Sequence, residues 1–116
     1  MQSHLFYILS QIIFPDVVGK VTASGPPVLG QGGYTLICDV HVADRLRPYI
    51  TTYLWTKNNS SVTELEVGTG LESNSLSFSS LRLSDADHYT CHAIVHSFRT
   101  NDDITVMASH NVRIQS

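Results

Sequence analysis

From residue 17 onward, the apolar residues of this chain fall in short alternating runs rather than in helical repeats. Nowhere do they hold a helical period for three turns, so the pattern predicts β-strands. The runs are separated by turn-forming groups: GPP at 25–27, GQGG at 30–33, NNSS at 58–61 and TNDD at 100–103. We expect strands over residues 19–23, 27–29, 34–40, 52–57, 62–67, 75–79, 88–96 and 104–114. Strands at such short spacing predict an all-β sandwich or barrel.

The alternation also predicts which side chains form the core. Side chains two residues apart on a strand point to the same face of a sheet. In several of the expected strands one face is apolar along its length. The residues on these faces include Tyr34, Leu36, Cys38, Trp55, Leu76, Phe78, Tyr89 and Cys91.

Length and charge narrow the possible classes of protein. A chain of 116 residues is long enough for one domain and too short for two. The formal net charge is -3, and the Lys and Arg residues are scattered rather than clustered. A nucleic-acid-binding surface needs a basic patch, so we expect no nucleic-acid partner.

Residues 1–16 form a segment distinct from the rest. They contain an apolar run from Leu5 to Phe14, which is about half the length needed to span a bilayer. No Lys or Arg precedes the run and no small-x-small cleavage site follows it, so the match to a secretory signal is poor. We expect an upstream linker or a signal remnant that packs as an extra strand or a short helix. The domain proper is expected to cover residues 17–116.

The chain has only two cysteines, Cys38 and Cys91, and neither has the neighbours of a structural zinc site. One possibility is a disulfide in an oxidising compartment, which would stabilise the fold by about 4 kcal/mol. The other is a pair of reduced core cysteines in a cytosolic protein. Two overlapping N-x-S sequons, at Asn58 and Asn59, favour an extracellular location, and steric crowding would allow a glycan on only one of them.

Three features together resemble the immunoglobulin superfamily: Cys38, Trp55 seventeen residues later, and the D-x-x-x-Y-x-C pattern at 85–91. The resemblance covers residues 19–114 and implies a two-sheet Greek-key β-sandwich. It implies that Cys38 and Cys91 bridge strands B and F and that Trp55 covers the bridge. It also implies that the Tyr89 hydroxyl bonds to the backbone at a tyrosine corner beside Asp85.

The spacing indicates a subtype within that superfamily. Only 36 residues separate Trp55 from Cys91, which favours an intermediate-set domain, or a variable-like one without all of its extra strands. Asp87 stands where the family usually has Gly or Ala, and no Arg occurs where strand D would pair with Asp85. More narrowly, YLWTKNNSS and LSFSSLRLSDADHYTC are similar to ectodomains of sponge receptor tyrosine kinases and sponge adhesion molecules. That likeness implies display outside the cell, cell contact and self-recognition.

The histidines raise the question of a metal site. His88, His92 and His96 are four residues apart, which would align them on one face of a helix. On a strand the same spacing separates neighbours by about 13 Å, too far for two of them to bind one ion. No hydrolase nucleophile motif and no phosphate-binding glycine loop occurs either. We therefore expect no metal, cofactor, small-molecule substrate or catalytic activity.

Two surfaces are candidates for contact with a partner. The first is the loop end of the sandwich, where HVADRLRPYITT and the turn after residue 97 carry Arg45, Arg47, Tyr49, Phe98 and Arg99. The alternative reading of this end is a lid, in which Leu46, Tyr49 and Ile50 cover the core. The second is the outer face of strands C, F and G, with Leu54, His92, Ile94 and His96.

These observations predict an extracellular recognition or adhesion module of a cell-surface receptor. We expect it to bind a protein ligand or a second copy of itself without catalysis, within a membrane-anchored parent protein. The alternative is a structural spacer domain in a multidomain ectodomain or an intracellular filament protein. Because one fold hosts many functions, this reading depends on analogy with the superfamily.

Overall fold

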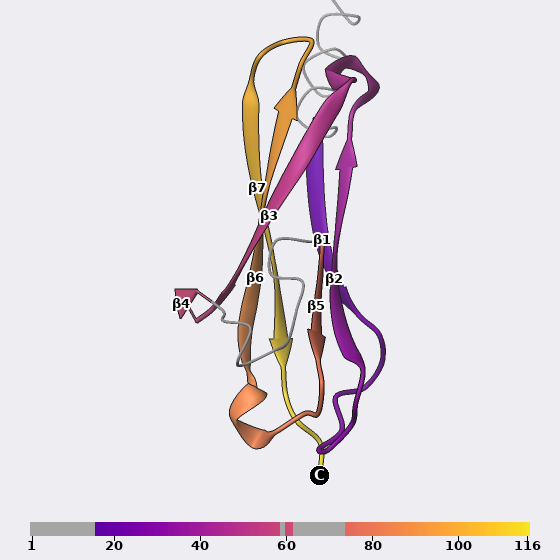
Figure 1. Cartoon of the computed structure of the whole chain (residues 1–116), viewed down its shortest axis with the longest axis vertical. Coiled ribbons are helices and arrows are strands. Elements are labelled where there is room, and N and C mark those ends of the chain that lie inside the picture. Colours follow the sequence, from indigo (N-terminus) through magenta and orange to yellow (C-terminus); the bar gives the residue numbers. More distant parts are fainter. Residues whose placement is uncertain (1–15, 59, 62–73) are drawn as a thin grey trace, which may run out of the picture.

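The computed structural model describes residues 16–58, 60–61 and 74–116, and these form a β-sandwich (Figure 1). The strands are β1 (Val17–Ala23), β2 (Tyr34–Val42), β3 (Tyr49–Lys57), β4 (Ser60–Ser61), β5 (Ser75–Phe78), β6 (Asp87–Ser97) and β7 (Asp103–Val112). Two 3₁₀ turns, η1 (Asp44–Leu46) and η2 (Leu83–Asp85), lie between strands.

The strands pair into two antiparallel sheets, as the sequence predicts. One sheet has the order β1-β2-β5 and the other the order β4-β3-β6-β7. The chain crosses from one sheet to the other between β2 and β3, between β4 and β5 and between β5 and β6, so β2 pairs with β5 and β3 with β6. These non-consecutive pairings are those of a Greek-key sandwich, and the predicted fold class is confirmed.

The space between the sheets holds the predicted core. Trp55 pairs in register with Cys91, and its side chain is 1% exposed. Phe78 packs edge-on against Tyr89, with ring centroids 5.6 Å apart. The ring of Phe78 also packs against that of Tyr34 in a tilted arrangement. The fully buried core side chains include Tyr34, Leu36, Cys38, Trp55, Leu76, Phe78, Tyr89 and Cys91. Burial of this apolar surface is the main force that holds the two sheets together.

A second core cluster closes the sandwich at the η1 end. Val17, Val42, Leu46 and Val95 are buried there, and Tyr49 packs against them with its side chain partly exposed. Leu46 is only 1% exposed although it lies in a connection between strands. Leu46, and in part Tyr49, therefore cover the core at this end, as the alternative prediction of a lid has it.

Several strand boundaries differ from those expected. β3 begins at Tyr49 rather than at Thr52, because Tyr49–Thr51 continue the ladder with Val95–Ser97 of β6. With β2 extending to Val42, the long connection expected before β3 shrinks to residues 43–48. β6 and β7 keep nearly the expected limits.

The strand expected at 27–29 is wrong. In its place Val28 forms an isolated parallel bridge with Gln115. Pro26 and Pro27 have no backbone N–H to donate to a ladder, which explains why a longer strand does not form. The strand expected at 62–67 lies outside the described residues.

Candidate functional site

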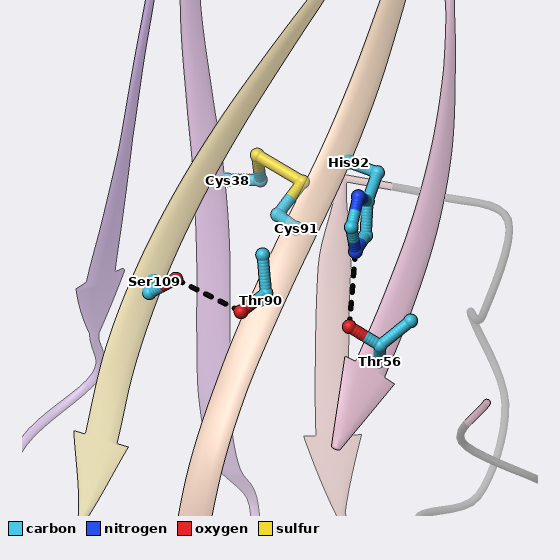
Figure 2. Close-up of a disulfide and its surroundings, with 6 residues drawn as sticks. All are labelled: Cys38, Thr56, Thr90, Cys91, His92 and Ser109. Atoms are coloured by element: carbon cyan, nitrogen blue, oxygen red, sulfur yellow. Dashed lines mark hydrogen bonds between the residues drawn. A yellow bond between two sulfur atoms is a disulfide. The ribbon is translucent and has the colours of Figure 1, made fainter. Parts of the chain in front are cut away.

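A disulfide between Cys38 of β2 and Cys91 of β6 joins the two sheets (Figure 2). Their Cα atoms are 6.3 Å apart and the bridge closes 53 residues of chain. Of the two possibilities left open for these cysteines, the structure has the oxidised pair. Both residues are buried, so the bridge is a structural bond of the core rather than an exposed reactive group.

The corner next to this bridge is built from short-range hydrogen bonds. The Tyr89 hydroxyl donates to the carbonyl oxygen of Asp85 at 2.6 Å. The Asp85 carboxylate, 1% exposed, accepts a hydrogen bond from the backbone N–H of Arg82 at 2.8 Å. The Arg82 guanidinium lies 3.4 Å from the second carboxylate oxygen.

The partner of Asp85 is thus a residue that the sequence analysis did not single out. The family pattern places an arginine on strand D, a distant segment, whereas Arg82 precedes Asp85 by three residues. The R-x-x-D spacing was the available signal, because a capping carboxylate bonds back to an N–H three residues earlier. The charge of this buried carboxylate is therefore compensated locally.

The outer face of the β3-β6-β7 sheet carries exposed apolar side chains. Leu54, His92 and Met107 form one row across the three strands, and Ile94 lies in the next row. Leu54 is 51% exposed and Met107 is 65% exposed. Ile50, also exposed, lies two residues before Thr52 on the same face of β3. Exposed apolar side chains gathered on one face in this way make it a candidate contact surface.

The three histidines of β6 occupy the same face, as the strand reading predicts. His92 Nε2 lies 3.0 Å from Thr56 Oγ1 of β3 (Figure 2), and His88 Nδ1 lies 2.6 Å from Asn111 Oδ1 of β7. His96 Nδ1 lies 2.7 Å from Asp103 Oδ1. Each ring is thus paired with a side chain on a neighbouring strand. In the part of the chain that the structure describes, no three His, Cys, Asp or Glu side chains are grouped so that they could hold a metal ion.

The turn between β6 and β7 displays Phe98 on a well-supported backbone. Phe98 is 61% exposed, and its N–H donates to the carbonyl of Pro48 at 2.9 Å. The buried Ser97 hydroxyl donates to the carbonyl of Leu46 at 2.7 Å. That hydroxyl oxygen also accepts from the N–H groups of Arg99 and Thr100, each at 3.3 Å. Ser97, which the sequence analysis missed, therefore ties this turn to the 43–48 connection.

Two of the arginines near this end, Arg45 and Arg47, are paired with acids. Arg45 forms a bidentate ion pair with Asp16, and this hydrogen-bonded partner lowers the pKa of the Asp16 carboxyl. Arg47 Nε lies 3.3 Å from Asp44 Oδ1, and both side chains are largely exposed. Arg45 thus holds the start of β1 against the 43–48 connection, while Arg47 and Arg99 point to solvent at the loop end.

The sheets, the disulfide and the corner together define the class of fold. Two antiparallel sheets, an inter-sheet disulfide, a tryptophan paired with the second cysteine and a tyrosine corner are the marks of an immunoglobulin-like domain. The chain has this fold. Neither a protein-family model nor a curated protein matches it.

Among solved structures, the chain is similar to murine CRIg, with a TM-score of 0.59 and 17% identity over 86% of this chain and 98% of that one. It is also similar to Drosophila OTK, extracellular domains 3-5, with a TM-score of 0.52 and 15% identity. That match covers 87% of this chain and 36% of the longer OTK fragment. Identities this low establish the fold alone, so the narrower likeness to sponge proteins stays a prediction.

The comparisons bear on chemistry and the disulfide bears on location. Both neighbours have immunoglobulin-like, non-catalytic folds. Disulfides form and persist in oxidising environments, so the intrachain disulfide is consistent with an extracellular location. Within the described ranges, the structure contains no helix that is both long enough and apolar enough to cross a membrane.

Proposed function

We propose that this domain is an extracellular recognition module that binds a protein partner, or a second copy of itself, without catalysis. The contact surface consists of Ile50, Leu54, Ile94, Phe98 and Met107, on the outer face of β3, β6 and β7 and on the adjoining turn. The observation that carries the proposal is the exposure of its large apolar side chains, 53% for Ile50, 61% for Phe98 and 65% for Met107.

The chemistry of this surface favours a protein partner. Aromatic and long apolar side chains at the centre of an interface, with charged groups at its rim, are typical of protein–protein contacts. Here the charged groups stand at the loop end, where Asp103 pairs with His96 and where Arg47 and Arg99 are exposed. Tyr49 and Arg45 contribute less, because Tyr49 packs on the core and Arg45 is bound to Asp16.

The support beneath the surface also suits recognition. β3, β6 and β7 are hydrogen-bonded along most of their length, and Ser97 fixes the turn that carries Phe98. A contact residue on rigid backbone loses little conformational entropy when it binds. The presentation of Phe98 therefore requires little rearrangement on association.

The test compares two serine substitutions on the surface with a matched one elsewhere. Phe98→Ser together with Met107→Ser should lower binding at least tenfold, the loss expected when contact residues central to an interface are removed. Val18→Ser is the control, because Val18 is a 45%-exposed apolar residue on the opposite sheet. Binding is measured as self-association by analytical ultracentrifugation and as attachment of the clustered domain to cells of the source organism.

The outcomes separate recognition from the spacer alternative. Binding by the unmodified chain that the double variant retains would remove this surface from consideration. No binding in either assay would favour the structural spacer. Anchoring of a parent receptor to a membrane and homophilic adhesion belong to the same proposal, and the ultracentrifugation arm addresses the homophilic form.

A further inference from the structure

Asn58, the first residue of the first sequon, lies between β3 and the edge strand β4 of the four-stranded sheet. Lys57 of β3, which directly precedes Asn58, pairs with Ser60 of β4. Asn58 is exposed and has a φ of 46°. Asparagine tolerates this left-handed conformation better than most residues, and two-residue hairpin loops require it.

The structural role of Asn58 that the contacts reveal is a backbone one. Its N–H donates to the carbonyl of His88 at 2.9 Å and so extends the β3–β6 ladder by one residue. A substituent on the side-chain amide leaves that bond intact. The fold can therefore carry a bulky, soluble group at this position without a change in the sheet.

We infer that Asn58 is the site of an N-linked glycan, which rests on the extracellular location contained in the proposed function. The donor is a lipid-linked oligosaccharide diphosphate. The amide nitrogen of Asn58 forms a bond to the anomeric carbon of the sugar and loses a proton, while the bond from that carbon to the diphosphate oxygen breaks. The acceptor motif is Asn58-Asn59-Ser60, in which Ser60 supplies the required hydroxyl residue.

The position of the glycan would direct contacts to the other end of the domain. Asn58 lies eight residues beyond Ile50 on β3, about 26 Å away at the usual rise per residue of a strand. β4 is the edge of its sheet in the strand order β4-β3-β6-β7. A glycan at the β3–β4 turn covers an edge that could otherwise pair with another chain, and it leaves Phe98 and Ile50 open.

The experiment uses the full chain secreted from a eukaryotic host and two matched serine variants. Ser60→Ala removes only the sequon that begins at Asn58, and Ser61→Ala removes only the one that begins at Asn59. We expect the unmodified chain and Ser61→Ala to lose mass on treatment with a peptide N-glycosidase, and Ser60→Ala to show no loss. The enzyme converts the modified Asn to Asp, so peptide mass spectrometry should find aspartate at position 58.

Two results would overturn the inference. One is a secreted, disulfide-bonded chain that carries no glycan. The other is a glycan that survives Ser60→Ala and is lost in Ser61→Ala, which would place it on Asn59. Because the readout is mass rather than association, either result leaves the proposed contact surface untouched, and failure of the contact surface leaves the glycan untouched.

Discussion

At the scale of single residues, Tyr34 is the side chain whose chemistry fits its surroundings least well. Its ring is fully buried and packs against Phe78. Among the described residues, no group forms a hydrogen bond with its buried hydroxyl. A buried polar group without a partner costs about 1–3 kcal/mol of stability. Burial also raises the pKa of the Tyr34 hydroxyl above its ordinary value of 10.0, because it disfavours the ionised form.

Tyr34→Phe should therefore stabilise the domain by about 1 kcal/mol, since the ring stays and the unpaired hydroxyl goes. The unfolded chain releases the Tyr34 proton at lower pH than the folded chain. For the unmodified domain this lowers the free energy of unfolding as pH rises above about 10, and the variant should lose less stability over that range. Urea denaturation at neutral pH and at alkaline pH measures both effects.

A less stable Tyr34→Phe variant at neutral pH would contradict this account. It would show that the hydroxyl is hydrogen-bonded in solution, for instance to an internal water. Thr105→Val, an exposed polar-to-apolar change on β7, is a control for the general effect of removing a hydroxyl.

At the scale of elements, the connection before β3 and the turn after β6 act as one unit. Ser97 joins them, because its hydroxyl donates to Leu46 and accepts from the turn. Leu46 in turn buries its side chain in the second core cluster. The exposed residues of the turn are therefore held by the core rather than by the loop itself.

Ser97→Ala should loosen this unit and leave the rest of the sandwich in place. The amides of Arg99 and Thr100 lose their acceptor, so their hydrogen exchange should become faster. The buried Leu46 carbonyl also loses its donor, for a cost of about 1–3 kcal/mol. Ser109→Ala is the control, because its hydroxyl is hydrogen-bonded to Thr90 on the exposed face of the sheet. Unchanged exchange at Arg99 and Thr100 would show that Ser97 does not hold the turn.

Period-two alternation was enough to predict most of the strands. It failed where contacts with a distant segment of the chain determine the structure. Tyr49–Thr51 were expected in the connection before the strand, yet they pair with β6. Arg45 read as a free contact residue, and its ion pair with Asp16 comes from a segment 29 residues away. Neither partner can be inferred from local pattern, because both depend on how the chain closes at the η1 end.

At the scale of the whole molecule, the disulfide is the covalent link between the sheets. A bridge that closes a loop of 53 residues stabilises a fold by about 4 kcal/mol, chiefly by restricting the unfolded chain. Small domains have a total free energy of unfolding of about 5–15 kcal/mol. The bridge therefore supplies a large part of the stability of this one.

Replacing both Cys38 and Cys91 by alanine should lower the free energy of unfolding by about 4 kcal/mol, to which the loss of buried sulfur contacts adds. Chemical denaturation of the oxidised chain, the reduced chain and the double variant measures this. A reduced chain as stable as the oxidised one would mean that packing alone holds the sheets together.

The fold could be predicted as a whole because its marks are local or regularly spaced: two cysteines, a tryptophan and a tyrosine corner. The proposed contact surface combines residues from both candidate surfaces: Phe98 from the loop end, and Leu54 and Ile94 from the outer face. Its apolar residues come from β3, β6 and β7, and only the register places Leu54 beside His92 and Met107. The partner contributes a surface of its own to the contact, so the sequence of this chain alone does not identify the partner.

Recognition through the outer face of β3, β6 and β7 is the central claim, and hydroxyl-radical footprinting of the bound domain tests it most directly. Met107 and Phe98 should be oxidised more slowly when the clustered domain is attached to its cells or to a second copy. Leu83, 67% exposed on η2 at the other end, should react at the same rate bound and free. Equal oxidation of Met107 and Phe98 in the bound and free states would contradict the claim.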